Sequence, residues 1–145
     1  MSVSLAFLST TVAVAVLFLV VNVIFWSISY VKRVIYPSVA PEVWRDMGTV
    51  EGQRRARQLG ALTTIGSSIF FVPFVWMLGP SFAGARVVVL AVIFWAAFSL
   101  PGACYNSIYY RIGTRMLCWQ AFAELIRIML GFVLVSWMLT VLGVW

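Results

Sequence analysis

The sequence predicts an all-α integral membrane bundle of four transmembrane helices, and two observations support this fold class. First, 63% of the 145 residues are apolar and 10% are charged, whereas soluble domains average roughly 45–50% and about 25%, and a globule of this length cannot hide so much apolar surface. Second, four stretches with few or no charges are each long enough to cross the hydrocarbon core, which takes about 20 residues. The predicted spans of this single domain (1–145) are residues 6–30, 58–80, 87–110 and 116–138.

The first span, residues 6–30, is an uncharged and largely apolar stretch that does not fit a cleavable signal peptide. No basic residue precedes it, and a signal core holds only about 7–15 apolar residues. Val12 to Val21 follow one another without the strict alternation of a membrane-barrel strand. We therefore expect a helix, in which Asn22 lies about two turns from the cytoplasmic end.

The connection at residues 31–57 is the only sizeable polar segment, and it leads into the second span. Pro37 and Pro41 prevent the first helix from continuing. Thr49 followed by Glu51 is typical of a helix N-terminus. The second helix is therefore expected to start near Thr49, before its apolar part at residue 58.

Basic residues gather on one side of the predicted membrane. Eight of them lie in residues 31–57 and in the turn between spans three and four, against Arg86 alone on the opposite side. Because Lys and Arg are enriched in cytoplasmic loops, residues 31–57 are predicted to be cytoplasmic and both termini to lie outside. The cluster of Arg54, Arg55 and Arg57 is either this topology signal or a contact for lipid headgroups or a partner protein.

The third span contains Pro101, which is expected to kink the helix and free a carbonyl group. Cys104 and Cys118 flank the turn between spans three and four. Thiols stay reduced on the cytoplasmic side of a membrane, and no C-x-x-C motif is present. We interpret both cysteines as small apolar side chains.

The candidate site is a layer of polar residues in the half of the spans predicted to face the cytoplasm. Gln120, Glu124 and Arg127 recur at i, i+4 and i+7 and so share one helix face. Gly131 on that face permits close approach of a neighbouring helix. Hydroxyl and amide side chains at helix contacts commonly act as structural glue, and this interpretation stays open for the Ser, Thr and Asn residues. The layer comprises Asn22, Thr64, Ser67, Asn106, Gln120, Glu124 and Arg127.

Glu124 and Arg127 are the charged members of this layer. An unpaired Arg near the membrane midplane costs at least about 2.5–3.5 kcal/mol, and Glu124 three residues earlier is close enough for an ion pair. Three interpretations remain open. The pair fixes helix register, or both charges reach the interface because span four is shifted toward Trp145, or they form a pocket for a lipid headgroup, quinone, anion or proton.

Several function classes are disfavoured by composition. The chain has no His, the commonest haem and metal ligand and usual general base, so we predict no metal site, no cofactor, no catalytic residues and no enzymatic activity. Long uncharged stretches separate the basic residues, which disfavours nucleic-acid binding. The expected function is an accessory or assembly subunit of a larger membrane complex, with a lipid bilayer and a membrane-protein partner or a second copy as partners. The alternative is a binding or transport protein for a lipophilic ligand or ion, using Glu124 and Arg127.

Several local motifs give the chain a family resemblance. They are Trp44 with Met47-Gly48-Thr49 and Glu51, then Asn106-Ser107-Ile108-Tyr109-Tyr110 before a basic turn, then Trp119, Glu124, Gly131 and Trp137. With this layout, most of the chain resembles the small four-helix bacterial membrane proteins grouped as domain-of-unknown-function family 1761. It departs from that pattern at Trp26-Ser27, where an aromatic pair is usual, and at Arg127. The resemblance implies a multi-pass protein of the bacterial inner membrane and no established activity.

Overall fold

The computed structural model describes residues 3–35, 49–82, 85–109 and 113–145, and all regular elements within them are helices. Four helical segments are long and apolar enough to cross a membrane, which confirms the predicted all-α membrane bundle. Their bounds, Val3–Ser27, Gln58–Leu78, Arg86–Tyr105 and Thr114–Val141, lie close to the predicted spans. The elements are α1 (Val3–Ser27), η1 (Val31–Ile35), α3 (Val50–Leu78), η3 (Pro80–Phe82), α4 (Ala85–Phe94), η4 (Trp95–Ser99), α5 (Leu100–Tyr109) and α6 (Thr114–Val141).

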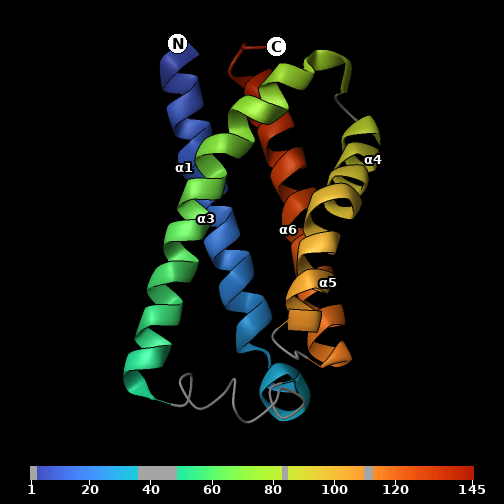
Figure 1. Cartoon of the computed structure of the whole chain (residues 1–145). Helices are drawn as coiled ribbons and strands as arrows, with labels where there is room; N and C mark the ends of the chain where they lie inside the picture. Colours follow the sequence, from blue (N-terminus) through green and yellow to red (C-terminus); the bar gives the residue numbers. More distant parts are fainter. Residues whose placement is uncertain (1–2, 36–48, 83–84, 110–112) are drawn as a thin grey trace.

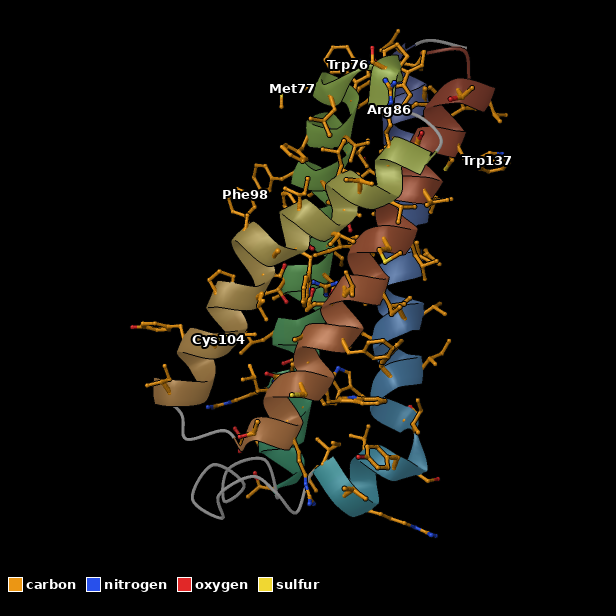
Figure 2. The ribbon with its side chains drawn as sticks, turned by 90° about the vertical axis from the view of Figure 1, so that its right-hand side faces the viewer. Trp76, Met77, Arg86, Phe98, Cys104 and Trp137 are labelled. Carbon is orange, nitrogen blue, oxygen red and sulfur yellow. The ribbon has the colours of Figure 1, made fainter. Side chains whose placement is uncertain are left out.

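The helices run up and down, so that the two chain ends lie at the same end of the bundle (Figure 1). We call this the terminal end; it also holds the connection from α3 to α4. The opposite end holds η1 and the first turns of α3 and α6, and we call it the basic end because Arg33, Arg54, Arg55 and Arg115 belong to these elements. Arg86 lies toward the terminal end (Figure 2). Pro37 and Pro41 lie outside the described residues.

The start of α3 agrees with the predicted capping signal. The Thr49 side chain accepts a hydrogen bond from the Gly52 backbone N–H at 3.0 Å, which satisfies one of the donors that a helix start leaves free. Glu51 in the first turn suits the positive end of the helix dipole. The prediction of a helix start near Thr49 is therefore confirmed.

The third span is interrupted by a π-helical turn, η4, immediately before Pro101. A proline lacks an N–H, and its ring clashes with the carbonyl four residues earlier, here that of Ala97. In η4 the Leu100 N–H donates to the Trp95 carbonyl five residues earlier, which is the π-helical pattern. The distortion expected at Pro101 thus takes the form of a local widening of the helix.

The main apolar core lies toward the terminal end and is built from aromatic rings. Phe132 of α6 is fully buried, and its ring packs edge-on against those of Phe71 and Phe74 from α3 and against Phe94 from α4. Gly131 beside it has no side chain, so the ring of Phe18 from α1 fits there; a Cβ at that position would lie 2.7 Å from it. All four spans therefore meet around one stretch of α6.

Candidate functional site

The first part of the candidate site joins α1 to α3. The Asn22 side-chain amide donates to the Thr64 hydroxyl oxygen at 3.2 Å, and the Thr64 hydroxyl donates to the Gly60 carbonyl at 2.6 Å. Thr64 is buried, and so is Ser68, whose hydroxyl donates to the Thr64 carbonyl. The polar groups of this contact thus satisfy one another inside the bundle, as groups in an apolar surrounding must.

The second part is the charged pair on α6. A guanidinium nitrogen of Arg127 lies 2.5 Å from a carboxylate oxygen of Glu124, and the two side chains are 19% and 34% exposed. The guanidinium carbon also lies 5.2 Å from the centre of the Phe18 ring, a cation–π distance. The Nε of Arg127 is buried and has no hydrogen-bond partner among the described residues. Arg127 is therefore paired with Glu124 and stacked on Phe18, while its buried Nε–H group donates to none of the described residues.

The two parts lie at a similar depth. Phe18, which touches Arg127, precedes Asn22 by one helical turn on α1. Phe18 lies about nine residues, or roughly 13 Å, before the end of α1 at Ser27. We call Asn22, Thr64, Glu124 and Arg127 the polar layer. Because Arg127 also lies near the middle of the 28-residue α6, this geometry favours a pair within the membrane over a pair at the cytoplasmic interface.

The remaining residues of the predicted site take different positions. Ser67 is exposed, and its hydroxyl donates to a carbonyl of its own helix, so the structure does not bring it to the polar layer. Gln120 is half-buried on α6, one turn before Glu124. The side chain of Asn106, in α5, is outside the part of the structure that is described.

The predicted basic contact lies on the first turns of α3. Arg54 and Arg55 are exposed, and Arg55 forms an ion pair at 3.1 Å with Glu51, which is also exposed. The side chain of Arg57 is outside the described part. One full charge, that of Arg54, therefore stands without an ion-pair partner among the described residues, in a position open to solvent or headgroups.

Sequence reasoning missed one polar contact that locks the third span to α6. The indole N–H of Trp95 donates to the Ala121 carbonyl at 2.8 Å. The signal for it was a tryptophan in the middle of a span, where this residue must find a hydrogen-bond partner when buried. The contact fixes η4, and with it the kinked region, against α6.

The chemistry available to the polar layer is limited to charge and hydrogen bonding. The described residues contain no group of three or more His, Cys, Asp or Glu that could hold a metal ion. Cys104 and Cys118 are both free thiols. What the layer offers is a carboxylate that accepts hydrogen bonds and a guanidinium that donates them.

Comparison with protein-family models, with curated proteins and with solved structures finds no match to this chain. The resemblance to domain-of-unknown-function family 1761 therefore stays a prediction. The four apolar helices and their packing define a small, multi-pass, helical-bundle membrane protein.

Proposed function

We propose that this membrane protein works as an accessory or assembly subunit of a larger membrane complex. The observation that supports this proposal is that the other helices of the bundle cover little of the third span. Only 11% of its membrane-crossing stretch is buried in the bundle, against 39% for the fourth span. Phe98, in η4, is 69% exposed; its ring packs on Phe94 of the same span and points away from the other spans (Figure 2).

The type of residue exposed in the basic half favours a protein partner over lipid alone. Lipid tails and partner helices are equally apolar, so hydrophobicity does not distinguish them, but helix–helix contacts are rich in small residues. On α3, Gly60, Thr63 and Ser67 recur at i, i+3 and i+7 and are all exposed. On α5, Gly102 is exposed and has open space where a Cβ would stand. A partner helix could therefore approach the backbone of α3 and of α5 closely at these positions.

Photo-crosslinking in native membranes tests this proposal. A photoreactive residue in place of Phe98 should give a product with another membrane protein. The same residue in place of Leu8, which is 62% exposed on α1 toward the terminal end, is the control and should give much less. A product of twice the chain's mass would indicate a homo-oligomer instead. Monomer alone from both positions would contradict the proposal.

We further propose that the basic end faces the cytoplasm of a bacterial cell, with both termini outside the inner membrane. The separation of the basic residues from Arg86 supports the orientation, and the family resemblance supports the bacterial membrane. Replacing Gly52 by Cys, in a chain without Cys104 and Cys118, allows a test with an impermeant thiol reagent. Intact cells should leave this Cys unlabelled and label a Cys in place of Ser81, which is exposed near the terminal end. The reverse pattern would overturn the orientation.

A second candidate function is binding of a lipophilic ligand or ion at the polar layer. The observation that favours it is the partial exposure of the Glu124 carboxylate together with the unused Nε of Arg127. Glu124→Gln keeps the size of the side chain and removes its charge. A small molecule that copurifies with the wild-type chain should then be lost from a variant that still folds. Identical extracts from both chains would contradict this candidate.

A further inference from the structure

A cavity of about 300 Å³ opens at the basic end, between η1 and the start of α6. It is separate from the polar layer, with which it shares no residue. One part of its lining is polar and comes from Thr114 and Arg115. The other part is apolar and includes Ile35, Trp119 and Phe122. The cavity therefore presents two chemically different sides.

The polar side is electropositive. The N-cap of α6 is Gly113, which has no side chain to cap the helix, and the Leu117 N–H is the donor that reaches the Gly113 carbonyl. The N–H groups of the first turn are left without helical acceptors, and they carry the positive end of the helix dipole. The exposed Arg115 adds a full positive charge. The described residues that line the cavity include no Asp or Glu to neutralise it.

The apolar side is a packed group of aromatic rings. The Trp119 ring lies 5.5 Å from that of Phe25 and 5.8 Å from that of Tyr30, and Ile35, which also lines the cavity, is buried. A wall of this kind suits the glycerol and first acyl carbons of a lipid better than a hydrated free anion. Trp and Tyr beside basic residues are also characteristic of headgroup depth.

We propose that this cavity binds the headgroup of an anionic phospholipid, with the phosphate at Arg115 and the α6 N-terminus and the glycerol region against Trp119. Charge complementarity supports this occupant, since the chain carries a net charge of +6 and the site has a cationic rim above an apolar wall. The residues of this site are distinct from Arg54, Arg55 and Arg57, and a lipid could bind there whether or not the protein is a subunit of a complex.

Native mass spectrometry of the full chain, released from mild detergent, tests the site with two lipids of identical acyl chains. The chain should retain phosphatidylglycerol in preference to phosphatidylcholine. Arg115→Gln should lower phosphatidylglycerol affinity by roughly fivefold or more, as expected for the loss of one Arg contact. Arg33→Gln is the matched control, because Arg33 is exposed on η1 and does not line the cavity; its effect should be less than twofold. Equal losses from both variants would show general electrostatic attraction and overturn the site.

A second variant tests the cavity without removing a charge. Cys118 is exposed and lines the cavity, so Cys118→Phe should fill it and reduce phosphatidylglycerol retention while the chain stays folded. Undiminished retention by this variant would overturn the proposal. Inorganic phosphate added in millimolar excess should not displace the lipid; displacement would identify a site for soluble phosphate and also overturn it.

Discussion

The two halves of the bundle are held together in different ways. Toward the terminal end, a dry cluster of aromatic and branched side chains from α1, α3, α4 and α6 surrounds Phe132. Toward the basic end, the contacts described are the Asn22–Thr64 and Trp95–Ala121 hydrogen bonds, the Glu124–Arg127 pair and the packing of the Trp119 ring on Phe25 and Tyr30, together with small buried residues. In a bilayer, association of helices depends on packing and polar contacts, since burial of apolar surface gives no advantage over lipid. The terminal half therefore supplies most of the stability, and the basic half keeps surfaces available for binding.

The largest expected effect is that of Phe132→Ala, which removes the ring at the centre of the aromatic cluster. Large-to-small substitutions in soluble cores cost about 3–5 kcal/mol for Phe. Because the dissociated helices are still surrounded by lipid, we expect a smaller loss here, about 2–4 kcal/mol. Unfolding by denaturing detergent measures it. Phe70→Ala is the control, since Phe70 is 78% exposed and should cost less than about 0.5 kcal/mol. Equal costs for the two variants would contradict the central place of Phe132 in the aromatic cluster of the terminal half.

The next effect concerns the charged pair. Arg127→Leu leaves the Glu124 carboxylate without its partner, and we expect a loss of about 2–3 kcal/mol, less than the ~3–5 kcal/mol of a fully buried pair because the Glu124 side chain is 34% exposed. Glu124→Leu should act similarly. The double Leu variant should recover much of the loss, since no charge is then stranded.

The control for this cycle is Arg55→Leu, which breaks the exposed Glu51–Arg55 pair and should change stability by less than about 1 kcal/mol. If both single variants at Glu124 and Arg127 match this control, the pair lies at the membrane interface, with span four shifted toward Trp145.

The smallest effect expected is that of a single methyl group. Gly131→Ala places a Cβ 2.7 Å from the Phe18 ring and 3.0 Å from that of Phe71, so the rings must move, at a cost of about 1–2 kcal/mol. Gly66→Ala has open space around the new methyl and should stabilise α3 by up to about 1 kcal/mol through helix propensity. Thermal unfolding of the two variants should shift in opposite directions. Shifts of the same sign would mean that α1 does not approach α6 as closely as the structure shows.

The fold could be predicted from the sequence because the thickness of the bilayer sets the length of the uncharged stretches that cross it. Local signals also sufficed for the start of α3 at Thr49, where the cap is formed by residues three positions apart. The sequence did not show that Ser68 is buried while its neighbour Ser67, which was predicted for the site, is exposed. These neighbours differ by about 100° around the helix, and packing of α3 against α1 and α6 decides which of them is buried.

Features formed between segments that are distant in the chain could not be predicted from the sequence either. Pro101 predicts a distortion, yet the π-helical turn that accommodates it is tied to α6 by Trp95 and Ala121, which are far apart in the chain. The cavity at the basic end likewise needs η1 to lie against the start of α6. The sequence shows that these residues are basic, aromatic or small, but it does not show that they lie together in space.

The terminal half holds the fold, whereas the polar layer is dispensable for folding. A variant carrying Asn22→Leu, Thr64→Val, Glu124→Leu and Arg127→Leu removes the whole layer at once, leaving no unpaired charge. The two hydrogen bonds it loses, Asn22–Thr64 and Thr64–Gly60, are worth about 0.6 kcal/mol each on average, and apolar replacement of an ion pair is often neutral. Its unfolding midpoint in denaturing detergent should therefore stay close to that of the wild-type chain and well above that of Phe132→Ala. A midpoint at or below that of Phe132→Ala would contradict the claim.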